Sequence, residues 1–63
     1  MKKQKLLKEL GKIAKSKGVE FGFVREGGSH EVWSFDGQNI PIPRHNEINE
    51  RLAKGLIRDA KNH

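Results

Sequence analysis

The chain lacks cysteine and tyrosine and contains only two prolines, one tryptophan and three phenylalanines. Without cysteine it can form neither disulfide bonds nor a cysteine-ligated zinc site. No apolar run approaches the length of a membrane span, and the basic N-terminus lacks the apolar segment of a signal peptide. These absences predict a protein of a reducing compartment, the cytoplasm, without a membrane partner. The length of 63 residues predicts a single domain, 1–63.

Basic residues outnumber acidic ones: 13 Lys and Arg face 8 Asp and Glu, which gives a formal net charge of +5. An excess of this kind favours a polyanionic partner, most simply a nucleic acid. A surface that merely keeps a small domain in solution has the same signature, so charge alone leaves both interpretations open.

Apolar residues at helical spacing predict one helix at each end of the chain. The first helix covers about residues 3–16 and ends at Gly18, with lysines outside its apolar stripe. The second starts near Asn46, a typical N-cap residue, with Glu47 in its first turn. Gly55 interrupts the second pattern, and we interpret it as a site of close packing between helix and sheet. The two stripes consist of Leu6, Leu7, Leu10, Ile13 and Ala14, and of Ile48, Leu52, Ala53, Leu56, Ile57 and Ala60.

Between these helices the sequence predicts three β-strands, of which the first two cover Val19–Arg25 and Glu31–Phe35. Asp36 and Gly37 are a strong signal for a two-residue hairpin that leads into the third strand. That strand contains both prolines, which cannot donate ladder hydrogen bonds, so it should lie at an edge of the sheet. The hairpin pairs Phe35 with Gln38, Trp33 with Ile40 and Glu31 with Ile42.

The hairpin between the first two strands has two possible registers. A four-residue loop pairs Trp33 with Gly22 and scatters the aromatic residues over both faces of the sheet. A three-residue loop pairs Trp33 with Phe21 and Glu31 with Phe23, which places every aromatic side chain on one face. We choose the second register, because a shift of one residue turns the apolar side of a strand to solvent.

Both amphipathic helices must dock on the apolar face of this sheet. The sequence therefore predicts an α+β fold, a two-layer sandwich of order α-β-β-β-α with a three-stranded antiparallel sheet. The four aromatic side chains are expected in the core. His30 is expected on the open face, opposite the helices, at the loop end of the central strand.

His30 follows the short loop Gly27-Gly28-Ser29 and is the leading candidate for chemistry. Such a loop lets backbone approach a ligand closely, and histidine titrates near neutral pH. In the chosen register His45 is the diagonal neighbour of His30, about 7–8 Å away at Cα. Two histidines beside one phosphate could divide the general base and general acid roles of RNA cleavage. Lys or Arg side chains, or the N–H groups of the loop, would stabilise the developing charge.

Each of these residues also has a plainer explanation. His30 would then be an ordinary exposed strand residue, Ser29 a turn residue and His45 a helix cap. His63 is terminal, and we expect it to be disordered. The three histidines lack the spacing of metal ligands, and the glycine loop lacks the context of a P-loop, so we expect neither a metal nor a cofactor.

An ordered set of motifs runs along the chain. It consists of Gly18, Gly28-Ser29-His30, Pro43-Arg44-His45, Lys54-Gly55 and Ile57-Arg58. In this order the motifs resemble those of HicA, the toxin of HicAB toxin–antitoxin modules, and the resemblance covers nearly the whole chain. The chain departs from the family pattern at Leu56, where Thr is frequent, and at Ala60, where a larger aliphatic residue is frequent.

The resemblance implies a fold similar to that of double-stranded-RNA-binding domains. It further implies a ribosome-independent mRNA endoribonuclease with His30 as its catalytic residue, and a HicB antitoxin as its partner. Two alternatives stay open: a non-catalytic module that binds double-stranded RNA, and, ranked last because no helix-turn-helix is predicted, a small DNA-associated regulator. We assign the RNA contacts to Gly28, Ser29, Arg44, Lys54 and Arg58.

Overall fold

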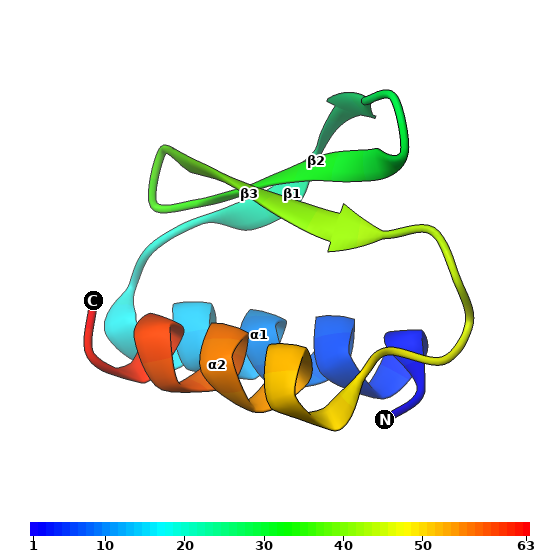
Figure 1. The fold of residues 1–63 in the computed structure, drawn as a ribbon. Coiled ribbons are helices and arrows are strands. Elements are labelled where there is room, and N and C mark those ends of the chain that lie inside the picture. The colour runs from blue at the N-terminus through cyan, green and yellow to red at the C-terminus, as the bar shows by residue number, and fades with distance from the viewer.

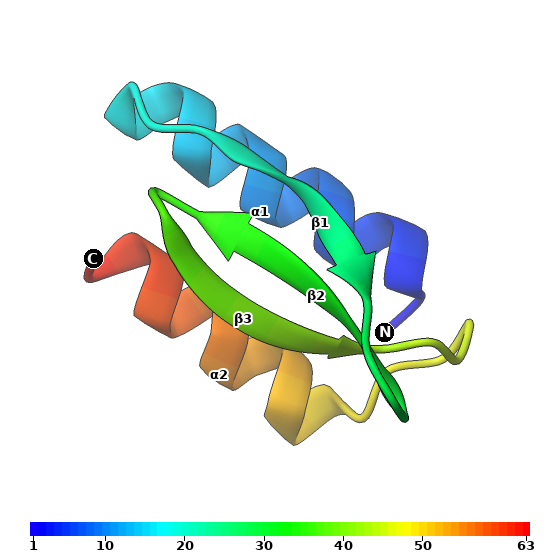
Figure 2. The same cartoon turned by 90° about the horizontal axis from the view of Figure 1, so that it is seen from above.

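The computed structural model describes all residues, 1–63, as an α+β fold in which a three-stranded antiparallel sheet covers two helices (Figure 1). The helices lie side by side beneath one face of the sheet, and the other face is open (Figure 2). The predicted fold class and element order are therefore confirmed. Neither helix combines the length and apolar character that a membrane span requires. The elements are α1 (Lys3–Lys17), β1 (Phe21–Glu26), β2 (His30–Phe35), β3 (Gln38–Pro43) and α2 (Glu50–Lys61).

The first helix, α1, forms and ends as the sequence predicts. Its buried residues are Leu6, Leu10 and Ala14, which recur every four residues along one stripe. Gly18 ends the helix in the left-handed conformation, with φ 71°, and donates its N–H to the last carbonyls of α1. A side chain would be strained at this φ, so glycine is the residue that stops the helix cleanly.

The predicted start of the second helix is wrong. Helix α2 begins at Glu50, and its N-cap is Asn49, whose Oδ1 accepts hydrogen bonds from the backbone N–H groups of Arg51 (2.8 Å) and Leu52 (3.3 Å). Asn46 and Glu47 lie before the helix. The preference of asparagine for N-caps applies to both Asn46 and Asn49, so the residue type alone cannot choose between them.

The segment before α2 is extended because it pairs with the N-terminal residues. Lys3 donates its N–H to the carbonyl of Asn46 (2.8 Å), and Ile48 donates its N–H to the carbonyl of Met1 (2.7 Å). The Lys2 ammonium lies 3.0 Å from a carboxylate oxygen of Glu47. These backbone hydrogen bonds between distant parts of the chain compete with helix formation and delay the start of α2.

The later start also changes which residues of α2 are buried. Ala53 and Ala60 are buried, whereas Leu52, predicted on the apolar row, is 40% exposed. The interpretation of Gly55 as a packing site is wrong as well, because a Cβ built there meets no atom within 4 Å. The core side of α2 thus combines two buried alanines with the partly buried Leu56 and Ile57, and Gly55 lies away from it.

The sheet has strand order β1-β2-β3, so β2 is central and the proline-containing β3 is an edge, as predicted. The predicted register between β2 and β3 is confirmed, with Trp33 opposite Ile40 and His30 opposite Pro43. Asp36 and Gly37 connect the two strands with φ angles of 52° and 81°. Two consecutive positive φ angles match the right-handed twist of the strands and set this register.

The predicted register between β1 and β2 is wrong by two residues. Phe21 lies opposite Phe35 and Phe23 opposite Trp33, and a β-bulge between Phe23 and Arg25 then shifts the pairing. A displacement of two residues keeps the side chains of β1 up to Phe23 on their predicted faces, because side chains alternate with a period of two. Beyond the bulge the alternation changes, and Arg25 lies opposite Val32. The bulge absorbs the one extra residue, and Gly27 donates its N–H to the carbonyl of His30 (2.8 Å) to close the loop.

The aromatic side chains do gather on the helix side of the sheet, but not all of them are buried. Phe35 is 4% exposed, and the Trp33 ring lies between those of Phe21 (5.1 Å, stacked) and Phe23 (5.6 Å, edge-on). Phe23 itself is 51% exposed, so it is only partly buried and not a core residue as expected. The core consists of Leu6, Leu10, Ala14, Phe35, Ile42, Ile48, Ala53 and Ala60.

His63 contacts the sheet and does not extend into solvent. Its Nε2 lies 2.7 Å from a carboxylate oxygen of Asp36, and its ring meets the ring of Phe35 edge-on at 5.3 Å. The end of the chain is thereby tied to the β2–β3 turn.

One partly buried ion pair joins α1 to the central strand. The Lys3 ammonium lies 2.8 Å from Oε1 of Glu31, and the indole N–H of Trp33 donates to the same oxygen at 2.9 Å. The hydrogen bond from Lys3, followed by that from Trp33, lowers the pKa of Glu31 below its ordinary value of 4.5. Glu31 therefore faces the helices, and its neighbour His30 faces away from them.

The capping role of Asn49 can be tested by substitution. We expect Asn49→Ala to lower the free energy of unfolding by about 1 kcal/mol, because two N–H groups of α2 lose their acceptor. Asn46→Ala is the matched control, since Asn46 contributes a backbone carbonyl that the substitution keeps. Urea denaturation of both variants measures the difference, and equal losses would contradict the assigned N-cap.

The ion pair of Glu31 predicts a particular acid sensitivity. A folded-state pKa below the ordinary value stabilises the fold above pH 4.5, and that contribution is lost as the pH falls through the lowered pKa. We expect the stability difference between wild type and Glu31→Gln to be largest near neutral pH and to shrink below about pH 4. Urea denaturation across this pH range is the measurement. Glu20→Gln, at an exposed position, is the control and should show no such convergence.

Candidate functional site

His30 is the first residue of β2 and is exposed on the open face of the sheet. It lies opposite Pro43 at the start of the central strand, where the β1–β2 loop turns away from the sheet. This is the position that the sequence predicts. Neither helix covers this face, so the imidazole is accessible to a large ligand (Figure 1).

The ring of His30 is held by its neighbour in the sequence. Ser29 Oγ and His30 Nδ1 are hydrogen-bonded at 3.0 Å, and the tautomer of the ring decides which of them donates. Because Nδ1 is used in this way, Nε2 is the ring nitrogen that remains for a substrate. A hydrogen bond to one ring nitrogen sets the orientation and tautomer of the imidazole, so Ser29 is a positioning residue for His30.

Arg44, which directly follows β3, forms hydrogen bonds that hold the glycine loop in place. Its Nε donates to Oε1 of Glu26 (2.8 Å), its Nη1 to the carbonyl of Gly28 (2.6 Å), and its Nη2 to the carbonyl of Gly27. Each guanidinium nitrogen therefore has a partner within the protein. The sequence-based assignment treats Arg44 as an RNA contact, and the structure adds a second task, the connection of β3 to the β1–β2 loop.

The two glycines of the loop differ in whether the fold leaves room for a side chain at their position. A Cβ at Gly27 would lie 2.7 Å from the carbonyl oxygen of His30, so only glycine fits there. A Cβ at Gly28 meets no atom within 4 Å, and no hydrogen bond within the protein engages the backbone N–H of Gly28 or Ser29. The fold needs Gly27, a requirement missed by sequence reasoning, while the backbone at Gly28 and Ser29 is open to a ligand.

The remaining predicted residues lie elsewhere. His45 is exposed in the segment between β3 and α2, and no hydrogen bond or ion pair joins it to the loop. Lys54 and Arg58 are exposed on α2, in the layer beneath the sheet. The predicted residues thus fall into two groups. The loop group is Gly28, Ser29, His30 and Arg44, and the helix group is Lys54 and Arg58.

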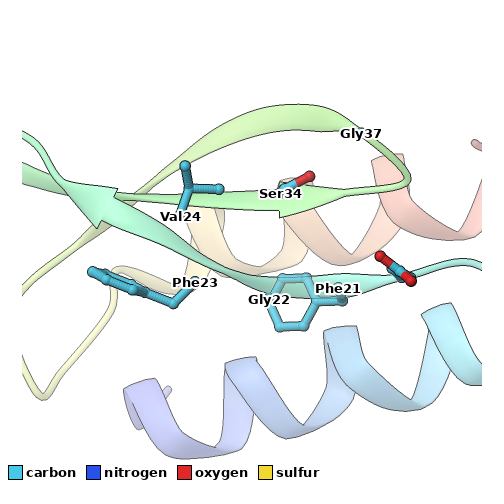
Figure 3. Close-up of a pocket in the computed structure, with 7 residues that line it drawn as sticks. Phe21, Gly22, Phe23, Val24, Ser34 and Gly37 are labelled. Atoms are coloured by element: carbon cyan, nitrogen blue, oxygen red, sulfur yellow. The ribbon is translucent and has the colours of Figure 1, made fainter.

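A shallow hollow of about 410 Å³ follows β1 and does not include His30. Figure 3 shows Val24 and Ser34 on the open side of the sheet and Phe21 and Phe23 on the helix side, so the hollow wraps around the free edge of β1. No group of three or more His, Cys, Asp or Glu side chains is gathered in a way that could hold a metal ion.

No protein-family model, curated protein or solved structure matches this chain.

The role of Arg44 in the loop can be measured without any substrate. We expect Arg44→Met to release Gly28 and Ser29, because three hydrogen bonds to the loop region are lost. The amide order parameters of these residues should fall from about 0.85 toward 0.6 or lower in NMR relaxation. Overall stability should change by about 1 kcal/mol at most, since the ion pair with Glu26 is exposed.

Arg25→Met is the matched control for this experiment. Arg25 lies near the end of β1, just before the loop, and its one hydrogen bond, to the carbonyl of Glu26, is long at 3.4 Å. Unchanged order parameters in both variants would mean that the glycine loop is rigid by itself.

Proposed function

We propose that this protein is an endoribonuclease of the HicA type, a toxin that cleaves mRNA with His30 as its catalytic residue. The observation that carries the proposal is the position of His30. It is exposed on the open sheet face beside a loop with open backbone, and its Nδ1 is bonded to Ser29 at 3.0 Å. The net charge of +5 agrees with an RNA substrate. So does a fold similar to that of double-stranded-RNA-binding domains, which the resemblance implies.

In the proposed reaction, Nε2 of His30 acts as general base toward a ribose 2′-hydroxyl. The proton moves to His30, the 2′-oxygen attacks the adjacent phosphorus, and the bond from phosphorus to the 5′-oxygen breaks. A general acid returns a proton to the leaving oxygen. The products are a 2′,3′-cyclic phosphate and a 5′-hydroxyl end. His45, on the segment that follows β3, is our candidate for the acid.

Charge builds up on the non-bridging phosphate oxygens during this step, and the loop supplies groups that oppose it. The free N–H groups of Gly28 and Ser29 are suitable donors, since donors fixed before the reaction stabilise charge most effectively. The Arg44 cation, anchored on the carbonyls of Gly27 and Gly28, adds positive potential at the same place. In this proposal Arg44 has two roles: it stabilises the transition state and it orders the loop.

We further propose that an antitoxin of the HicB type covers the loop group. A partner that presents carboxylates to this face would imitate the phosphates of RNA and exclude the substrate from His30. The alternative function, a non-catalytic module for double-stranded RNA, is favoured by one observation: Lys54 and Arg58 lie on α2, in the layer away from His30, and would bind phosphates without involving it.

The decisive experiment compares RNA cleavage by wild type and by His30→Ala on a gel. Because both histidines are exposed, we expect His30→Ala and His45→Ala to remain folded, which NMR spectra confirm first. We expect His30→Ala to reduce the cleavage rate by about two to four orders of magnitude, the usual contribution of a general base. His45→Ala should also slow cleavage while leaving the affinity for RNA unchanged.

Each outcome has a clear meaning. Equal cleavage by wild type and His30→Ala would remove His30 from the chemistry. An unchanged rate for His45→Ala would remove only His45. RNA binding without cleavage by any of the three proteins would favour the non-catalytic module.

A further inference from the structure

Gly55 lies inside α2, where glycine is the poorest helix former apart from proline. Its φ is not in the left-handed range, and a Cβ there would meet no atom within 4 Å. Neither backbone conformation nor internal packing requires a glycine, so the fold would gain from alanine at this position. The same holds for Gly11 on α1, so only its surroundings can distinguish Gly55 as a site of contact with another molecule.

The surroundings of Gly55 suggest what that contact is. Ala53 and Ala60 mark the buried side of α2, and Gly55, two residues from Ala53, points about 200° away from it around the helix. On this outer side lies a hollow of about 740 Å³ without any apolar lining residue. Its lining consists of Glu50, Arg51, Lys54, Gly55 and Arg58.

The charge of this hollow is positive. Glu50, its one acidic residue, lies 3.0 Å from the Met1 ammonium, which compensates its charge. Arg51 and Lys54 form no ion pair with a carboxylate, and Arg58 reaches only its neighbour Asp59, at 3.8 Å and with both side chains about three-quarters exposed. Exposed pairs of this kind are weak and leave the cation available to another anion.

We propose that the outer face of α2 is a groove for the sugar–phosphate backbone of RNA, with Gly55 as its floor. Arg51, Lys54 and Arg58 flank the floor one helical turn or less away and supply the charge. The missing side chain lets a phosphate or ribose lie against the helix backbone, closer than any Cβ would allow. The choice of RNA among polyanions rests on the proposed function.

This groove is separate from the loop group. His30 lies on the open face of the sheet, whereas α2 lies beneath the opposite face (Figure 1). The groove therefore takes a different stretch of the RNA from the phosphate at His30. It should govern affinity and KM, and leave kcat at saturating RNA nearly unchanged.

Two glycine substitutions test the groove. Gly55→Ala and Gly11→Ala each replace a helical glycine whose Cβ would meet open space, and Gly11, on α1, lines none of the hollows. Both should raise Tm by about 4–8 °C, because alanine is the better helix former. Only Gly55→Ala should weaken binding of a labelled, mixed-sequence single-stranded RNA, by about tenfold, the effect of one moderate steric conflict. Binding is measured in the His30→Ala background, so that cleavage does not interfere.

A second variant tests the charges of the groove. Arg58→Gln should lower the slope of log affinity against log salt by about 0.7, the loss of one phosphate contact on a single strand. Equal RNA affinity of Gly55→Ala and Gly11→Ala, together with an unchanged salt slope for Arg58→Gln, would overturn the groove. Cleavage that depends on His30 would still stand in that case. Conversely, weaker binding by Gly55→Ala without cleavage by wild type would support the groove and reject the nuclease.

Discussion

Burial of a single face of a small sheet is the constraint on which the other features depend. Only eight residues of the chain are buried, and they come from both helices, the central and third strands and the segment before α2. With so small a core, no element is stable alone, and the sheet must keep its apolar side under the helices. The alternation of side chains along β2 then leaves His30 on the other side. The exposure of the candidate catalytic residue is thus a consequence of how the core is made.

The loop that precedes His30 is ordered by a residue that lies outside the loop. A loop with two glycines has little conformational preference of its own. Arg44, which follows β3, supplies the missing order through its bonds to Glu26, Gly27 and Gly28. Since β3 pairs with β2 next to His30, the loop, the histidine and the arginine form one connected unit. A site of this kind keeps its donors in place before a substrate arrives, which is what electrostatic stabilisation of a transition state requires.

Two of the basic groups lie on different layers of the molecule. Arg44 lies at the loop, and Arg51, Lys54 and Arg58 flank Gly55 on α2, in the layer beneath the sheet. A long polyanion can contact both groups only by passing around the molecule, whose extents are 29, 23 and 16 Å. In the function that we propose, this arrangement would separate the chemistry of cleavage from the affinity for RNA.

The sequence by itself determined the α-β-β-β-α order, the β2–β3 register and the face on which each aromatic residue and His30 lies. These features follow from local rules: the period of two in strands, the spacing of apolar residues in helices, and the Asp36-Gly37 turn. The tertiary structure decided the β1–β2 register, the start of α2 at Glu50, the contact of His63 with Asp36 and the bonds of Arg44 to the loop. Each of these depends on partners far away in the sequence, such as Met1 for the segment before α2 or Asp36 for His63. Local pattern carries no information on such contacts, because they exist only once the chain has folded and brought the partners together.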